Sequence, residues 1–428
     1  MTTTRRNVLA GAALAASFAL SPAFAQAPTE IELFFPVPVD GQLARDMAAL
    51  IKEFNEKNPS IKATPVYTGS YDETLIKTRA AMKAGKPPAV IMSANFLLDL
   101  KIEGEIQPMD GLIKADGKTN DQFMGQFFDA LHGNAVLDRQ VYGVPFDSGV
   151  TGLYYRTDYL EQAGYKPSDM ENLTWDRFIE IGKDVKAKTG HEMMALDSND
   201  GGLIRIMMQS GGQWYFNADG SLNISGNAAL KAALETQARI VNEGVAKPTS
   251  GWNDGISALT SGDVASVLMG VWITGTVKSQ ADQAGKWALT AIPKLSIDGA
   301  TAASNLGGSS WYVLDASAEK DEAIDFLNEV YAKDLDFYQK ILTERGAVGS
   351  LLAARTGEAY QKADDFFGGQ KVWQNFADWL VQVPAVNYGI FTNELDTAVT
   401  ANFPALLKGA PVDDVLKAIE DQAAGQIQ

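Results

Sequence analysis

The stretch Ile31-Glu32-Leu33-Phe34-Phe35-Pro36 opens the part of the chain that decides the fold. It is a short apolar run that a proline ends, as expected of a buried strand. Apolar residues then recur alternately at helical spacing and in short runs. Strands are predicted at 31–35, 61–67 and 89–92, with helices between them at 43–54 and 75–82. This order predicts an α/β fold with a mostly parallel sheet flanked by helices.

Polar residues follow these strands. Ligands of such sheets bind at the carboxyl ends of the strands, so the loops there are the first candidates. Tyr71 follows Gly69-Ser70 after the second strand, and Asn95 follows the third. We predict that both side chains contact a ligand.

A long extended stretch, residues 142–155, reads as a strand that leaves one lobe and enters a second one. Asp147 and Ser148 interrupt its apolar residues, which suits a position at the crossing. We predict that the Asp147 carboxylate binds ligand hydroxyls there, with a turn or cap role as the alternative. A Gly-rich segment followed by Trp311 to Leu314 predicts the return crossing. The division expected is a first lobe of 26–146 plus about 302–345, and a second lobe of about 150–300 plus about 350–428.

The N-terminus reads as an export signal, residues 1–25. Arg5 and Arg6 precede an apolar run too short to cross a bilayer, and Ala23-Phe24-Ala25 suits signal peptidase. The paired arginines resemble a twin-arginine signal, while Sec export stays open. We expect cleavage after about Ala25. Because no cysteine follows, no lipoprotein anchor is expected, and the mature protein should be periplasmic.

The composition of the chain excludes several classes of function. The length of 428 residues favours two domains, and a net charge of −17 disfavours nucleic acid and anionic membranes as partners. With two histidines and no cysteine, no metal site is predicted, and no nucleotide or nucleophile motif is present. The run Asp197 to Gly201 reads as a capped turn rather than a calcium loop. We therefore predict no cofactor and no catalytic residue, although 53 acidic residues leave a carboxylate pair possible.

Several of the eight tryptophans stand beside glycine or polar residues. A flat ring can cover the apolar face of a sugar while nearby polar groups bind its hydroxyls. The alternative for each ring is a place in a core. Trp252, Trp272 and Trp311 are predicted to contact the ligand, and Trp214 belongs to the same group.

Eight short segments together resemble the family 1 extracellular solute-binding proteins of ABC importers, which serve carbohydrates and polyols. They are EFNEKNP at 53–59, TGSYDET at 68–74, GKPPAV at 85–90, VPFDS at 144–148, LYY at 153–155, TWD at 174–176, SGDVA at 261–265 and GG at 307–308. The resemblance implies a two-lobe periplasmic-binding-protein-like fold of type II with a hinge. It also implies a monomer that closes on a sugar or polyol and delivers it to two permease subunits with an ATPase pair.

Within the family, the chain is most similar to the glycerol-3-phosphate-binding members. That likeness implies ligand contacts from Tyr71, Asn95, Ser148 or Gly149, and the turn Gly307-Gly308. Two positions depart from it. The family's tyrosine falls near Ala347, and its phosphate-binding arginine near Asn387, next to Tyr388, which we also predict at the site. Since phosphate normally needs a fixed charged donor, a neutral sugar or polyol is favoured, unless Arg345 substitutes.

Three alternatives stay open from the sequence. The ligand can be glycerol 3-phosphate or a glycerophosphodiester. The protein can be an exported carbohydrate-active enzyme that uses two cleft carboxylates. It can also be a sensory module that presents its ligand to a receptor.

Overall fold

The computed structural model describes residues 27–39, 42–94, 106, 109, 117–137 and 140–427. The predicted signal peptide and Asn95 lie outside the described residues.

The first strands and helices form as the sequence predicts. β1 (Thr29–Phe35), α1 (Gln42–Lys57), β2 (Ile61–Tyr67), α2 (Tyr71–Lys83) and β3 (Val90–Ala94) follow one another. β1 pairs in parallel with both β2 and β3, so the predicted βαβαβ unit is confirmed. The carboxyl ends of the three strands therefore lie at one edge of the sheet.

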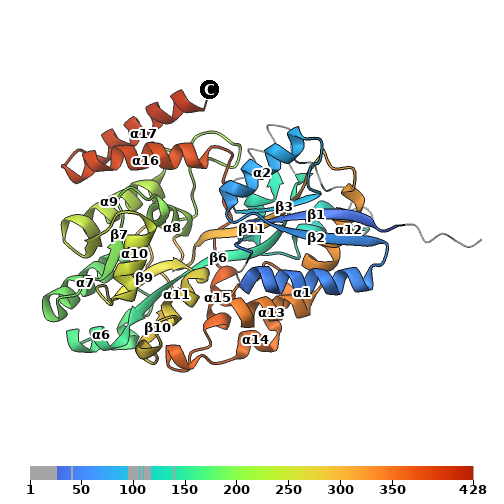
Figure 1. Cartoon of the computed structure of the whole chain (residues 1–428). Helices are drawn as coiled ribbons and strands as arrows, with labels where there is room; N and C mark the ends of the chain where they lie inside the picture. Colours follow the sequence, from blue (N-terminus) through green and yellow to red (C-terminus); the bar gives the residue numbers. More distant parts are fainter. Residues whose placement is uncertain are drawn as a thin grey trace, which may run out of the picture.

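Two long strands connect the halves of the molecule. β6 (Gly143–Arg156) and β11 (Asn305–Val313) pair antiparallel and run between the two lobes (Figure 1). β11 also pairs with β3, whereas β6 continues to β9 (Ser266–Gly270) and β10 (Trp287–Thr290). One sheet with the order β10-β6-β11-β3-β1-β2 results, with β9 also on β6. The second lobe thus adds antiparallel pairs to the α/β fold, because both of its strands on β6 return against that strand's direction.

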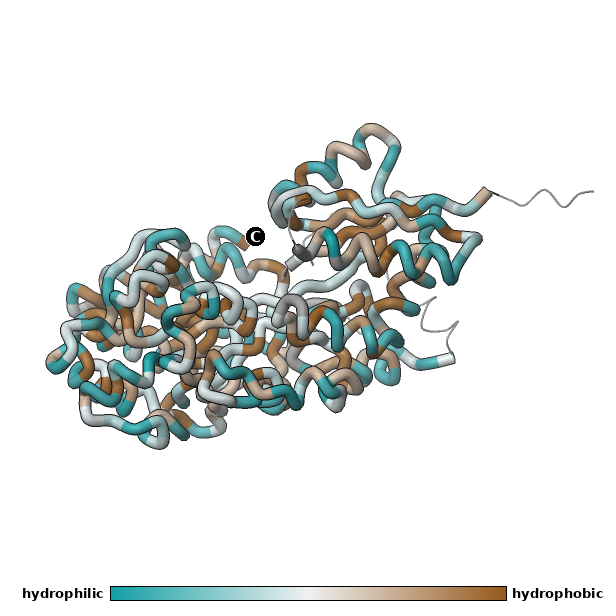
Figure 2. Tube along the Cα trace, turned by 60° about the horizontal axis from the view of Figure 1, so that its bottom comes forward, coloured by the Kyte–Doolittle hydropathy of each residue, from teal (hydrophilic) through white to brown (hydrophobic). Residues whose placement is uncertain are grey.

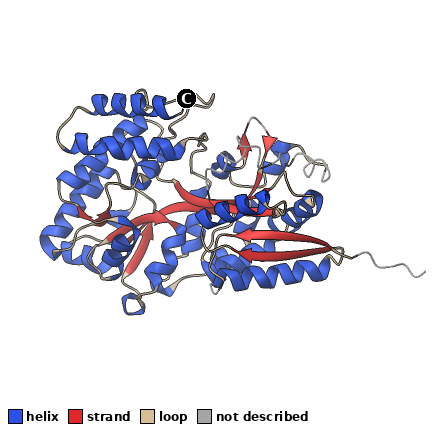
Figure 3. Cartoon of the chain, turned by 45° about the horizontal axis from the view of Figure 1, so that its top comes forward, coloured by secondary structure: helices blue, strands red, loops and turns tan. Residues whose placement is uncertain are grey.

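Helices cover the strands of both lobes (Figure 3). The remaining strands are β4 (Val136–Leu137), β5 (Gln140–Val141), β7 (Met194–Leu196) and β8 (Ala246–Pro248). The remaining α-helices are α5 (Asn120–Met124), α6 (Thr157–Ala163), α7 (Trp175–Thr189), α8 (Gly202–Ser210), α9 (Ala228–Asn242), α10 (Gly251–Thr260), α11 (Thr274–Lys278), α12 (Lys320–Tyr331), α13 (Leu335–Arg345), α14 (Glu358–Gln361), α15 (Val372–Leu380), α16 (Thr392–Leu407) and α17 (Val412–Gln426). Short 3-10 turns join them at 129–134, 167–170, 271–273, 281–283, 352–356 and 365–367. Within the described ranges, no helix combines the length and apolarity that a membrane span requires.

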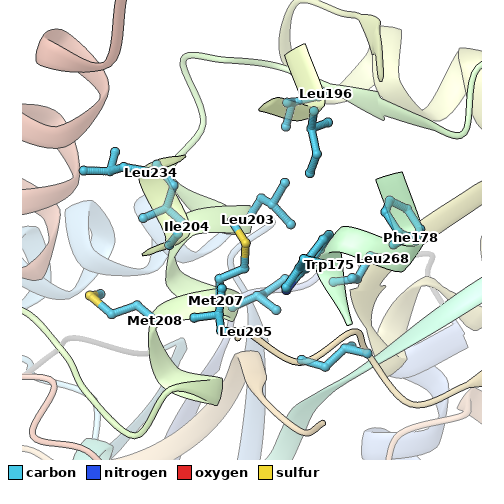
Figure 4. Packing of buried hydrophobic residues seen from close by; sticks show 14 of the residues in the cluster. Trp175, Phe178, Leu196, Leu203, Ile204, Met207, Met208, Leu234, Leu268 and Leu295 are labelled. Carbon is cyan, nitrogen blue, oxygen red and sulfur yellow. The ribbon is translucent and has the colours of Figure 1, made fainter. Parts of the chain in front are cut away.

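Each lobe has its own hydrophobic core, and hydrophobic stretches of chain run through both lobes (Figure 2). The first-lobe core combines residues from 31–146 with others from 311–354. The second-lobe core combines 153–295 with 388–423, and Figure 4 shows Trp175, Phe178 and Met207 within it. Each large side chain buried in this way stabilises the fold by about 1.5–3 kcal/mol. A third cluster forms around Tyr154 of β6 and Phe376 of α15. It combines residues from 128–303 with others from 342–383.

Candidate ligand-binding site

Tyr71 lies where the sequence predicts it, at the carboxyl end of β2. Gly69 turns the chain with a φ of +102°, a conformation that favours glycine. Ser70 then caps α2 by accepting the N–H of Glu73 at 3.2 Å. Tyr71 is therefore the first residue of the helix, and 38% of it is exposed. Its hydroxyl lies 2.8 Å from Oγ of Ser309 on β11.

Glycines bring β6 and β11 unusually close together. Gly307 and Gly308 have φ values of +91° and +95°, and the strand register shifts at this point. A Cβ on Gly149 would lie 2.0 Å from the Leu306 carbonyl oxygen, so only glycine fits there. The Asn305 side chain fixes the turn by accepting the N–H of Gly149 at 2.9 Å and donating to the Gly307 carbonyl at 2.7 Å.

Asp147 and Ser148 have different surroundings although they are neighbours on β6. The Asp147 carboxylate is half-buried and accepts the N–H of Ser309 at 2.7 Å. Ser148 is buried, and both its N–H and its hydroxyl donate to the Val348 carbonyl, at 2.9 and 3.1 Å. Ser148 thus joins β6 to the segment around Val348, a third connection at the crossing. The prediction that Ser148 contacts the ligand is wrong, because its hydroxyl is buried and already donates its proton to the Val348 carbonyl.

Trp252 and Trp272 lie against each other at the second-lobe end of β11. Their ring centroids are 5.6 Å apart, and the planes meet at 46°. Trp252 comes from the first turn of α10, and Trp272 from the 3-10 turn after β9. Both rings stay largely exposed, at 53% and 43%. The Trp272 indole N–H donates to the Leu306 carbonyl at 2.9 Å, which fixes this ring beside Gly307.

These contacts define one continuous surface, which we call the β11 strip. It runs from the tryptophan pair, past the Gly307-Gly308 turn, to Asp147 and Tyr71. Exposed aromatic rings next to a carboxylate, a phenol and a glycine backbone are suited to binding a polar ligand with apolar faces. The residues of the β11 strip are Tyr71, Asp147, Trp252, Trp272, Gly307, Gly308 and Ser309.

A cavity of about 130 Å³ adjoins the β11 strip in the second lobe. Trp252 belongs to the strip and also lines the cavity, and Leu306, which directly precedes Gly307, lines it too. Asp197 and Asp200 are the carboxylates among the lining residues. Asp197 accepts the N–H groups of Asn199 at 2.9 Å and Gly251 at 2.6 Å. These two N–H groups, Asn199 first, lower the pKa of the Asp197 carboxyl below its usual value. The capped turn predicted at 197–201 is confirmed, since Asp200 also accepts the N–H of Gly202 at 2.7 Å.

Two predicted aromatic contacts belong to the cores instead. Trp311 is 0% exposed and lies edge-on to Phe35, with ring centroids 4.8 Å apart. Tyr388 is 2% exposed; its hydroxyl accepts a hydrogen bond from the Gln209 amide at 2.9 Å, and its ring packs against Trp214. The predictions that Trp311 and Tyr388 contact the ligand are therefore wrong, because neighbouring side chains enclose both rings and a ligand cannot reach them. Trp214 is likewise buried, at 2% exposure.

The two positions that depart from the glycerol-phosphate-binding pattern lie outside the β11 strip. The Asn387 amide donates to the Asn217 carbonyl at 3.0 Å, on a surface that also includes His132. Ala347 packs against the first-lobe core, and the side chain of Arg345 lies outside the described set. Sequence reasoning missed Ser309 and Asp197. The position of Ser309 directly after Gly307-Gly308 could have indicated its place at the site. Nothing in the sequence indicates that the N–H of Gly251 donates to Asp197.

Two lobes on crossing strands, with an aromatic and polar strip on those strands, define a protein that captures a ligand. The chain belongs to the family of bacterial extracellular solute-binding proteins, whose model matches residues 49–368. Membership in a family of binding proteins places the chain outside the enzymes. Among the described residues, no group of three or more His, Asp or Glu side chains is arranged to hold a metal ion.

Relatives with known names are binding proteins as well. The lactose-binding protein of Rhizobium radiobacter is 92% identical over 293 residues, which make up 68% of this chain and 69% of that protein. The arabinooligosaccharide-binding protein of Bacillus subtilis is 27% identical over 65% of this chain and 64% of its own length. The sn-glycerol-3-phosphate-binding periplasmic protein UgpB of Agrobacterium fabrum is 31% identical over 42% of this chain and 40% of its own. The likeness to glycerol-phosphate-binding members is therefore real, but the lactose-binding relative is far more similar.

Solved structures support the two-lobe fold. The crystal structure of a cyclic α-maltosyl-1,6-maltose-binding protein from Arthrobacter globiformis superposes with a TM-score of 0.77. The match covers 93% of this chain and 98% of that one at 20% sequence identity. At this identity the similarity concerns the fold.

Proposed function

We propose that this protein is the exported substrate-binding component of an ABC importer, and that its ligand is a galactose-containing disaccharide such as lactose. The observation that carries the proposal is the exposed pair of Trp252 and Trp272 at the end of a polar strip. The 92% identity to a lactose-binding protein supports the choice of sugar.

The β11 strip offers each kind of contact that a disaccharide needs. The rings of Trp252 and Trp272 present apolar area to the faces of the sugar rings. The Asp147 carboxylate, which accepts the N–H of Ser309, brings acceptor oxygens to the strip, and carboxylate oxygens suit sugar hydroxyls as partners. Tyr71 adds a phenol, and the open turn at Gly307-Gly308 lets a ligand approach the backbone. A neutral ligand also agrees with the net charge of −17.

Capture follows from the position of the strip at the crossing strands. Tyr71 and Asp147 belong to the first-lobe side, and the tryptophan pair to the second-lobe side. A sugar that contacts both sides favours the closed arrangement, because only closure makes both sets of contacts at once. The lobes, divided at about 146–150, 300–302 and 345–350, would move about β6, β11 and the segment near Val348. The closed form is what a pair of permease subunits with their ATPases would recognise.

Export and oligomeric state complete the proposal. The signal at 1–25 directs the chain out of the cytoplasm, and cleavage after Ala25 leaves Gln26 as the first residue. The mature protein is a periplasmic monomer without a lipid anchor. Mass spectrometry of the exported protein measures the cleavage site, and light scattering measures its oligomeric state.

A thermal-shift and calorimetry screen tests the ligand. The probes are lactose, galactose, maltose, arabinobiose and glycerol 3-phosphate. A ligand at 100 times its Kd stabilises the folded state by about 2.7 kcal/mol, so lactose should raise Tm by several degrees. A larger shift with glycerol 3-phosphate would reject the choice of ligand. Chromatography of lactose after incubation checks the enzyme alternative, and we expect the sugar to be recovered intact.

A further inference from the structure

The cavity beside the β11 strip is bounded mainly by apolar side chains. Its walls come from β7, α8, α10 and β9. Leu196, Leu203, Leu259 and Leu268 contribute to them, and each is less than a tenth exposed. Three of these leucines belong to the second-lobe core, and Figure 4 shows Leu196, Leu203 and Leu268 around the same region. The cavity is thus a recess with apolar walls between the second-lobe core and α10, and it is partly open where the exposed Trp252 lines it.

The size of the gap suits a small ring. Protein interiors normally pack as densely as organic crystals, and a cavity lowers stability in proportion to its volume. An apolar cavity of about 150 Å³ stays dry and accepts benzene. The cavity here is partly open, since the exposed Trp252 lines it, and at about 130 Å³ it has room for a phenyl ring or a short alkyl chain.

The cavity also adjoins the β11 strip through shared and neighbouring residues. Trp252 is 53% exposed and lines the cavity, while Leu306 lines it and accepts the indole N–H of Trp272. The two carboxylates nearby are held by backbone groups, Asp197 by Asn199 and Gly251, and Asp200 by Gly202. Polar groups thus stand at one side, and the walls behind them are apolar. A ligand on the strip can place its polar part outside and an apolar group within.

We propose that this cavity is an aglycone pocket, and that the protein binds aryl and short alkyl galactosides through it. The inference rests on the proposed function, because the galactose ring must first occupy the β11 strip. It adds a ligand class, in which an apolar group replaces the second sugar of the disaccharide. Transfer of such a group from water into an apolar pocket is favourable, so the aglycone adds to affinity.

Calorimetry with phenyl β-galactoside, methyl β-galactoside and lactose tests the proposal. For the wild-type protein, we expect phenyl β-galactoside to bind roughly tenfold more tightly than the methyl compound. Equal affinities of the two galactosides would overturn the pocket while leaving the proposed function intact. If lactose and both galactosides fail to bind, the proposed function is wrong and the pocket is rejected with it.

Two variants fill the cavity. Gly255 of α10 lines it, and a Cβ placed there has no neighbour within 4 Å, so Gly255→Leu adds volume without a clash at Cβ. Leucine also favours a helix more than glycine does, so this variant should fold. Ala195→Leu on β7 fills the cavity from the opposite element. In both variants the ratio of phenyl to methyl affinity should fall to about one, since no room remains for the ring.

Gly425→Leu is the matched control. Gly425 lies in α17, its Cβ position is equally open, and it does not line the cavity. This variant should keep the roughly tenfold ratio of the wild type. A ratio that survives in both Gly255→Leu and Ala195→Leu would show that the phenyl ring binds elsewhere and would overturn the proposal.

Discussion

The hydroxyl groups of Tyr71 and Ser309 lie 2.8 Å apart, although 238 residues separate them in the sequence. The contact joins the first turn of α2 to β11, so the loop after β2 is held against the strand that reaches the second lobe. The position of the Tyr71 ring at the β11 strip therefore depends on this bond and on the cap at Ser70.

Tyr71→Phe should weaken lactose binding about fivefold, because it removes one hydrogen bond worth about 1 kcal/mol. Tm should change little, since the ring is partly exposed. Calorimetry measures the Kd. Tyr165→Phe is the control, because its hydroxyl donates at 2.5 Å to Asp184, away from the strip. Equal loss of affinity in both variants would contradict the site.

Trp272→Ala and Trp252→Ala should each weaken lactose binding by roughly tenfold or more, because each removes a ring that would cover a sugar face. Neither variant should unfold, since both side chains are largely exposed. Leu335→Ala on α13 is a control of similar exposure, 43%, outside the strip. Kd from calorimetry and Tm from the same samples separate binding from folding. Unchanged affinity would remove the altered ring from the site.

Local patterns allowed part of this structure to be predicted. The βαβαβ unit followed from apolar spacing, because each strand and helix carries its own period within about ten residues. The place of Tyr71 followed from the rule for parallel sheets, which concerns the order of elements rather than distant contacts. The glycines near the two exposed tryptophans act differently. Gly251 has open space around its Cβ position, whereas Gly270 lets the Trp272 ring lie against the backbone, because a Cβ there would lie 2.3 Å from the indole nitrogen.

Contacts between distant segments could not be predicted in this way. Trp252 and Trp311 both follow small residues, Gly251 and Ser310, yet Trp252 is exposed and Trp311 is enclosed. The difference arises because Trp311 faces Phe35, a residue almost three hundred positions earlier. The buried state of Ser148 likewise depends on Val348. The spacing of apolar residues within a strand does not indicate which of its faces a distant segment of the chain will cover.

Trp311→Ala should lower the free energy of unfolding by about 3–5 kcal/mol, because it leaves a cavity in the first-lobe core. Trp311→Phe should cost less. Phenylalanine retains an aromatic ring, and it removes a buried indole N–H that has no hydrogen-bond partner among the described residues. Urea unfolding of the three proteins measures the order. A larger loss for Phe than for Ala would contradict this account of the core.

Asp197 should link stability and sugar binding to pH. Its carboxylate accepts the N–H of Gly251, 54 residues away, which fixes the start of α10 and so the place of Trp252. Because the backbone N–H groups lower the pKa of Asp197 in the folded state, its contribution to stability is present above the unfolded-state value of about 3.9. The contribution is lost as the pH falls through the lower folded-state pKa.

Asp197→Asn should remove this contribution, because the neutral amide is a weaker acceptor and turns an N–H toward one of the two donors. We expect Asp197→Asn to be less stable than the wild type at pH 5–7, and the difference to shrink at the acidic end of a series from pH 7 down to pH 3. Lactose affinity at pH 7 should fall as well, since Trp252 loses its support. Urea midpoints across this series measure the effect, with Asp378→Asn as an exposed control whose carboxylate accepts from the Gln374 side chain at 2.7 Å. A stability difference that instead grows toward low pH would have the wrong sign for a lowered pKa.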